Sequence, residues 1–69
     1  MREWLKNKRK DKGMTMKALG EELGVSESYY CAIENGSRKA ELSLPMAQKI
    51  AAVFGITVDE ISRLEEVAG

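Results

Sequence analysis

The stretch that decides the fold is TMKALGEELGVSESYYCAIENG, residues 15–36. The spacing of its apolar residues predicts two short helices, over about residues 16–23 and 27–34. Thr15 and Ser26 directly precede these helices, and both are residue types that cap helix N-termini through a side-chain oxygen. About three residues remain between the helices, which is a turn length typical of a helix-turn-helix.

Two glycines in this stretch have specific places in that pattern. Gly20 lies inside the first helix, where glycine is ~1 kcal/mol less favourable than alanine, so we expect the second helix to approach it closely. Gly24 ends the same helix and can adopt the positive φ that the turn needs. The apolar positions that the two helices share are Leu19, Leu23, Val25, Tyr30 and Ile33. This spacing favours a DNA-binding helix-turn-helix, although a generic αα-hairpin shows it as well.

The chain on either side of this stretch is also helical in pattern. Before it, Trp4, Leu5 and the stem of Arg9 form one buried stripe of a helix that ends at Gly13. After it, Ser43 is suited to cap a fourth helix. The apolar face expected for this helix consists of Leu44, Ala47, Ile50, Ala51 and Phe54.

The start of a fifth helix is the best marked of all. Thr57 and Glu60 form a capping box, and Ile56 and Ile61 form the matching hydrophobic staple. No stretch of the chain alternates apolar and polar residues as a strand would. The sequence therefore predicts an all-α fold of five short helices around one small core.

The composition is that of one small globular domain, which we expect to span residues 1–69. Of its residues, 43% are hydrophobic and 32% are charged. The single cysteine excludes an internal disulfide, and one cysteine without any histidine excludes a zinc site. The longest apolar runs are far below the ~20 residues of a membrane span, and no apolar segment near Met1 marks a signal peptide. We expect a cytoplasmic protein without a cofactor or a membrane partner.

The charges are unevenly distributed although they cancel, with 11 basic and 11 acidic residues. Residues 1–12 contain six basic and two acidic side chains, a net charge of +4. From Asp59 onward, four acidic side chains oppose one basic side chain, a net charge of −3. A basic face favours a polyanionic partner, although a lysine-rich helix that merely faces solvent has the same composition.

Several short segments resemble the helix-turn-helix domain of phage-type repressors, the family of the lambda repressor, Cro and the xenobiotic-response-element regulators. They are residues 8–15 (KRKDKGMT), 23–26 (LGVS), 33–36 (IENG), 49–51 (KIA) and 54–56 (FGI). The resemblance covers about residues 4–64. It implies a lambda-repressor-like, five-helix DNA-binding domain, with its helix-turn-helix at about residues 15–34, whose second helix enters the major groove.

The resemblance also implies roles for individual residues. Arg9 and Glu34 match a buried ion pair that connects the first helix to the end of the recognition helix, the second helix of the helix-turn-helix. The residues expected to read bases are Glu27, Ser28, Cys31 and Ala32. The residues expected at phosphates are Lys12, Met16, Lys17, Tyr29, Asn35, Gly36, Arg38 and Lys39. Tyr29 can equally well be a partly exposed surface residue without a ligand. For Cys31, a small packing residue is favoured over a redox switch, because no neighbour in the sequence clearly activates the thiol.

The sequence departs from the family pattern at three positions of this set. Met16 and Glu27 stand where glutamine is common, and Ala32 stands where a basic or amide side chain is usual. Glu27 either accepts a hydrogen bond from cytosine N4 or only stabilises the N-terminus of its helix. The loop over residues 36–43 is also about two residues longer than is common. These departures put base readout in doubt more than the fold.

We therefore expect a sequence-specific regulator of transcription, a repressor that binds double-stranded DNA as a homodimer on a palindromic operator. The last helix has more apolar positions than an edge helix requires, which indicates a dimer interface. Its expected members are Phe54, Ile56, Val58, Ile61 and Leu64, with Val67 on the same helix. The alternative is an antitoxin-like module that binds a protein partner on the same fold. An enzyme is not expected, because Glu27, Ser28 and Tyr29 have no histidine or suitably placed lysine as a base.

Overall fold

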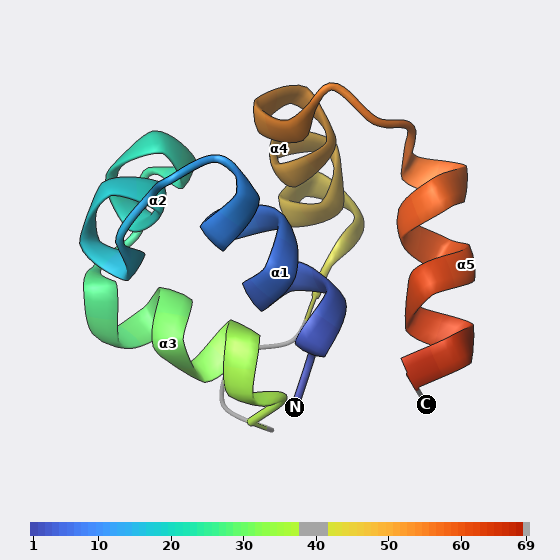
Figure 1. Cartoon of the computed structure of the whole chain (residues 1–69), viewed down its shortest axis with the longest axis horizontal. Helices are drawn as coiled ribbons and strands as arrows, with labels where there is room; N and C mark the ends of the chain where they lie inside the picture. The colour runs from blue at the N-terminus through green and yellow to red at the C-terminus, as the bar shows by residue number, and fades with distance from the viewer. Residues whose placement is uncertain (38–41, 69) are drawn as a thin grey trace.

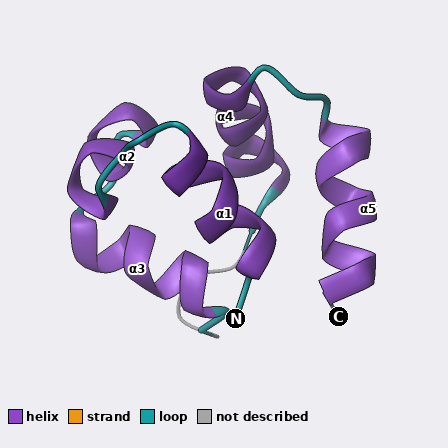
Figure 2. Ribbon diagram, viewed as in Figure 1, coloured by secondary structure: helices purple, strands orange, loops and turns teal. Residues whose placement is uncertain are grey.

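The fold is all-α, as the sequence predicts. The computed structural model of the chain describes residues 1–37 and 42–68, with side chains as far as Glu66. Within these ranges it contains the helices α1 (Glu3–Asp11), α2 (Met16–Leu23), α3 (Glu27–Asn35), α4 (Leu44–Phe54) and α5 (Val58–Ala68). No strand occurs in the part of the chain so described (Figure 2).

Four of the helices begin where the sequence predicts, because each has a side-chain cap. The hydroxyls of Thr15, Ser26, Ser43 and Thr57 accept hydrogen bonds from the backbone N–H groups of Ala18, Tyr29, Met46 and Glu60, at 3.0, 3.1, 3.3 and 3.1 Å respectively. Each bond satisfies one of the N–H groups that the first turn of a helix leaves free. Helix α1 has no such cap, since its preceding residue is Arg2.

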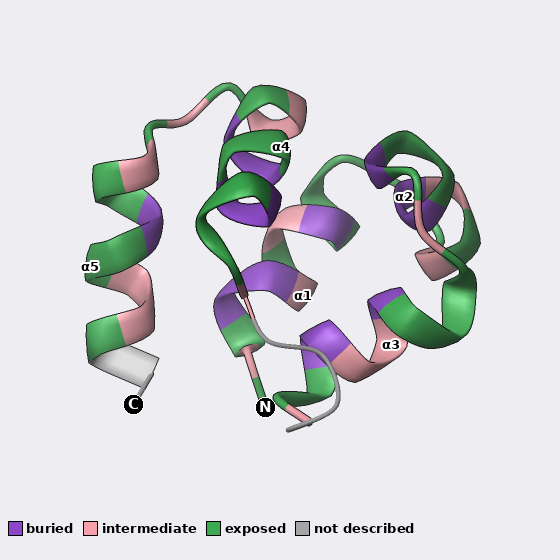
Figure 3. Ribbon diagram, turned by 180° about the vertical axis from the view of Figure 1, so that it is seen from behind, coloured by how far each residue is buried: buried purple, intermediate pink, exposed green. Residues whose placement is uncertain are grey.

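The helices are arranged so that α2 and α3 lie on the side of the molecule opposite to α5 (Figure 1). Helices α1 and α4 lie between them, and α1 contacts both α3 and α5. The apolar residues of the described chain that are no more than 2% exposed form the core, and they are Leu5, Leu19, Leu23, Tyr30, Ile33, Ile50 and Ile61. Figure 3 shows in purple where buried residues lie along the helices. Burying each such side chain stabilises the fold by about 1.5–3 kcal/mol before the loss of chain entropy is subtracted.

The apolar face predicted for α4 is wrong at its first residue. Ala47, Ile50 and Ala51 are buried as expected, but Leu44 is 61% exposed. Leu44 is the first residue of the helix, and it lines a surface pocket rather than the core. Met46, which was not expected on the apolar face, is buried.

Candidate nucleic-acid interface

Helices α2 and α3 meet in a tight turn that fixes their relative position. Helix α2 ends at Gly24, which has a φ of +75°, and α3 begins after Ser26. A Cβ on Gly20 would lie 3.2 Å from the Val25 carbonyl oxygen and 3.3 Å from that of Ser26. The expected close approach at Gly20 is therefore present. Its partner is the backbone that leads into α3, so a larger side chain there would displace the start of α3.

Helix α3 has one side in the core and one side toward solvent. Its buried residues are Tyr30, Ile33 and Glu34. Among the residues expected to read bases, Glu27 and Ser28 are exposed and Cys31 is half-buried. Ala32 is also half-buried and packs against the core, so its methyl group offers less surface to a partner.

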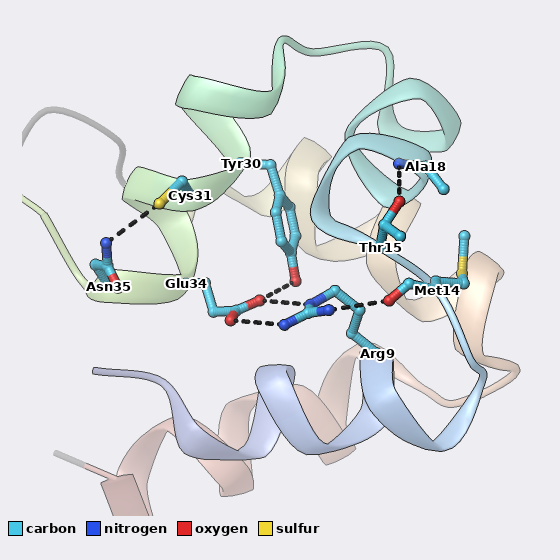
Figure 4. Close-up of polar contacts among 8 residues, drawn as sticks. All are labelled: Arg9, Met14, Thr15, Ala18, Tyr30, Cys31, Glu34 and Asn35. Carbon is cyan, nitrogen blue, oxygen red and sulfur yellow. Dashed lines mark hydrogen bonds and ion pairs between the residues drawn. The ribbon is translucent and has the colours of Figure 1, made fainter.

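The end of α3 is closed by its own backbone. The N–H of Gly36 donates to the Ile33 carbonyl at 3.2 Å, and the N–H of Ser37 donates to the Ala32 carbonyl at 2.9 Å. The Asn35 side chain lies on the surface and its Nδ2 donates to the Cys31 Sγ at 3.4 Å (Figure 4). The Gly36 amide expected at a phosphate is therefore already bonded, and the Asn35 side chain is the more accessible group.

The other residues expected at phosphates differ in their exposure. Lys12 and Lys17 are exposed, and Tyr29 is 41% exposed. Met16 is half-buried against the core, and its thioether has no proton to donate to a phosphate. Arg38 and Lys39 lie outside the described residues.

The exposed surface of α2 and α3 carries more acidic than basic side chains. Its carboxylates are those of Glu21, Glu22 and Glu27, and its one described basic residue is Lys17. Lys10 and Lys12, at the end of α1, are exposed as well and add positive charge that could attract a polyanion. The described basic side chains near this surface therefore lie mainly outside α2 and α3.

The inner side of α3 is held by a buried ion pair with α1 (Figure 4). The Arg9 Nε lies 3.1 Å from the Glu34 Oε2, and the Arg9 Nη2 lies 3.3 Å from the Oε1. The Arg9 Nη1 donates to the Met14 carbonyl at 2.9 Å. Hydrogen bonding to Glu34 raises the pKa of Arg9 above its usual value, so the guanidinium remains charged in spite of its burial.

The side chain of Tyr30, which was predicted only to lie in the core, also joins this ion pair. The Tyr30 hydroxyl donates to the Glu34 Oε2 at 2.7 Å. Burial, followed by this hydrogen bond, raises the pKa of Tyr30 well above its ordinary value of 10.0. The four-residue spacing of Tyr30 and Glu34 on one helix was a signal for this contact, because such residues lie one above the other.

A second ion pair, between Arg2 and Glu65, was not predicted from the sequence. The Arg2 Nε lies 2.8 Å from the Glu65 Oε1, and the Trp4 Nε1 donates to the same oxygen at 2.8 Å. Arg2 also donates through Nη1 to the Ile33 carbonyl at the end of α3. Arg2 and Glu65 are 63 positions apart, so no local pattern could have paired them.

The residues expected at a dimer interface are not all available for one. Ile61 is only 2% exposed and belongs to the core of its own chain, so its assignment to an interface is corrected. Phe54, Ile56, Val58 and Leu64 are half-buried and pack against that core with part of their surface. The side chain of Val67 lies outside the described residues.

No group of three or more His, Cys, Asp or Glu residues in residues 1–37 and 42–68 is arranged to hold a metal ion. None of the helices described has the length and apolar character needed to cross a membrane.

Comparison with known proteins gives two matches. A family model described as "Helix-turn-helix" matches residues 5–61. An uncharacterized HTH-type transcriptional regulator of Bacillus subtilis (strain 168), YqaF, is 38% identical over 55 residues, which cover 80% of this chain and 70% of the relative. No solved structure matches the chain.

Proposed function

This chain belongs to the helix-turn-helix family, and on that premise we propose that it is a transcriptional regulator that binds specific sequences of double-stranded DNA. In this proposal the N-terminal part of α3 enters the major groove, and the surrounding helix ends contact phosphates. Binding over a promoter excludes other proteins from it, so we propose a repressor that acts in the cytoplasm.

The observation that carries the proposal is the division of α3 into a fixed side and a free side. Glu34 and Tyr30 hold the helix from within through buried hydrogen bonds. Glu27 and Ser28 are exposed on its first turn. A helix that reads base edges needs both properties, because the geometry of a hydrogen bond to a base tolerates little movement.

Selection of binding sites from a random duplex library tests this proposal. We expect the wild-type protein to enrich one sequence and to bind it more tightly than random duplex in gel shifts at a stated salt concentration. Equal affinity for every duplex would contradict sequence-specific reading.

A pair of matched variants shows which helix does the reading. Ser28→Ala and Ser62→Ala make the same change at exposed serines, on α3 and α5 respectively. We expect Ser28→Ala to alter the enriched sequence and Ser62→Ala to leave it unchanged. The opposite result would move the reading surface to α5.

We further propose that two copies bind one palindromic operator. One domain of this size has a small DNA interface, and specific affinity usually requires two half-sites. The surface proposed for the contact between copies is formed around α5 by Phe54, Ile56, Val58 and Leu64.

A second candidate function is an antitoxin-like module that binds a protein partner. The excess of exposed carboxylates on α2 and α3, from Glu21, Glu22 and Glu27, favours it because phosphates repel them. If this function holds, the wild-type protein enriches no duplex in the selection even at low salt. The same experiment therefore separates the two candidates.

A further inference from the structure

Arg2 lies where three helices meet. Its backbone N–H donates to the Glu34 carbonyl at 2.7 Å, and its Nη1 donates to the Ile33 carbonyl. Both carbonyls belong to the last turn of α3. Its Nε donates at 2.8 Å to the Glu65 carboxylate of α5. One side chain thus connects the end of α3 with α5.

The carboxylate of Glu65 is also held by a residue of α1. The Trp4 indole of α1 donates to the same carboxylate oxygen as Arg2, at 2.8 Å. The side chains of Arg2 and Glu65 are 15% and 32% exposed, so solvent screens the pair only in part. Trp4 is 8% exposed and anchors the carboxylate from the core.

The position of the guanidinium suits the charge of a helix end. The last carbonyl groups of a helix carry partial negative charge, and a cation placed on them stabilises the final turn. The Ile33 carbonyl that Arg2 contacts is also the acceptor for the Gly36 N–H. Arg2 therefore acts directly on the cap that closes α3.

We propose that Arg2 is a positioning residue, which fixes the end of α3 to α5 through Glu65 and thereby sets the position of Asn35 and Gly36. Its effect on DNA affinity rests on the proposed function, in which Asn35 and Gly36 lie at a phosphate. Its effect on the end of α3 does not depend on DNA.

Amide hydrogen exchange of the free protein tests the link to α3, with an internal reference. Helix α2 ends in the same pattern of backbone bonds, from Gly24 to the Glu21 carbonyl at 3.1 Å and from Val25 to the Gly20 carbonyl at 2.9 Å. In Arg2→Met, which retains the apolar stem, we expect the Gly36 and Ser37 amides to exchange roughly tenfold faster. The reference amides of Gly24 and Val25 should keep their rates.

A purely structural role gives a different exchange pattern. If Arg2 only contributed to overall stability, the amides at both helix ends would exchange faster in parallel, and the proposal would be overturned. Arg2→Lys retains the charge but cannot donate to carboxylate and carbonyl through separate nitrogens, so we expect an intermediate rate at Gly36 and Ser37.

Two matched variants test the contribution of α5. Glu65→Gln and Glu66→Gln remove the same charge from neighbouring positions, but Glu66 is exposed and only Glu65 holds Arg2. We expect Glu65→Gln to accelerate exchange at Gly36 and Ser37 and Glu66→Gln to leave it unchanged. Equal effects of the two variants would overturn the link to α5.

Gel shifts on the duplex selected by the wild-type protein give the second readout. We expect Arg2→Met to bind that duplex roughly tenfold more weakly while remaining folded by circular dichroism. Unchanged affinity would overturn the proposed effect on DNA binding. Should the wild-type protein select no duplex, the proposed function fails, while the exchange rates still decide whether Arg2 positions the end of α3.

Discussion

The Arg9 guanidinium and the Glu34 carboxylate lie side by side, with Nε 3.1 Å from Oε2 and Nη2 3.3 Å from Oε1. The side chain of Glu34 is completely buried and that of Arg9 is 10% exposed. A charge in such a place is tolerated only with a partner, because its removal from water is unfavourable by several kcal/mol. The pair therefore forces α1 and the end of α3 to remain together.

The first prediction concerns the stability that this pair provides. Arg9→Ala or Glu34→Ala should each lower the free energy of unfolding by about 3–5 kcal/mol, since each leaves an unpaired buried charge. The double variant should lose clearly less than the sum of the two. Urea unfolding measures these values, and additive losses would show that the two side chains are not directly coupled.

Exposed charges provide the control for this experiment. Lys10→Ala and Glu22→Ala remove the same two kinds of charge from surface positions on α1 and α2. We expect each of these to change the free energy of unfolding by less than about 0.5 kcal/mol. Because a small domain has only about 5–15 kcal/mol in total, Arg9→Ala requires a check by circular dichroism that it is folded before urea is added.

The second prediction is a loss of stability at alkaline pH that depends on Tyr30. Its pKa in the folded protein is raised above the ordinary value of 10.0, first by burial and then by the bond to Glu34. The folded state therefore holds the hydroxyl proton more tightly than the unfolded state. The resulting stability is complete below the ordinary value and is lost as the pH rises above it, by up to about 1.4 kcal/mol per pH unit.

Urea unfolding across the range from neutral to alkaline pH measures this effect. Tyr30→Phe should be less stable at neutral pH by about 1.5–3 kcal/mol, and its stability should fall less steeply above pH ~10. Tyr29→Phe makes the same chemical change at an exposed position and should keep the wild-type slope. Identical slopes for the two variants would exclude Tyr30 as the titrating group.

Most of the fold could be predicted from the sequence because its signals are local. A cap such as Thr15 acts on a residue three positions away, and the N–H of Ala18 does bond to it. The burial of Tyr30 follows from its place in the helical period. Leu44 also lies on the apolar face that the helical periodicity predicts, but it is exposed. It is the first residue of α4, and periodicity does not show whether the core extends as far as the end of a helix.

The contacts around the candidate nucleic-acid and dimer interfaces could be predicted less completely than the fold, because they join residues that are far apart in the sequence. The link from Arg2 to Glu65 joins segments near the two ends of the chain, and the local sequence around each residue gives no sign of its partner. Ile61 shows that the role of an apolar residue is equally hard to predict from local sequence. Its apolar character indicates burial, but only the packing of α5 decides that it is buried in its own chain.

The third prediction concerns association through α5. Leu64 is half-buried, so part of its surface is free for a second copy. Leu64→Asp should shift the protein from dimer to monomer in sedimentation velocity, because a carboxylate cannot be desolvated in an apolar contact. It should also weaken binding to paired half-sites centred about 34 Å apart.

Two controls keep this result specific to α5. Glu22→Lys changes charge on α2 and should leave the dimer intact, and circular dichroism should show that Leu64→Asp retains its helices. A wild-type protein that sediments as a monomer at high micromolar concentration and binds single half-sites as well as pairs would exclude the proposed dimer.

The last prediction separates the residues that position the DNA from those that read it. Lys17 is exposed at the start of α2, and a phosphate contact there adds affinity without sequence information. Lys17→Ala should therefore weaken binding about equally on all sequences. It should also flatten the slope of log K against log salt by about 0.9, since one counterion-releasing contact is lost. Arg38→Ala and Lys39→Ala should behave alike.

Glu27→Gln is the informative variant within the same measurement. Removal of its charge should raise affinity for every duplex, because phosphates no longer repel the first turn of α3. A preference for cytosine should relax only if Glu27 accepts from cytosine N4, by about 1–3 kcal/mol at that position. Substitutions at Ser28 should change base preference by a similar amount and leave the salt slope nearly unchanged. If Lys17→Ala altered the preferred bases while Ser28 variants did not, α3 would not be the recognition helix.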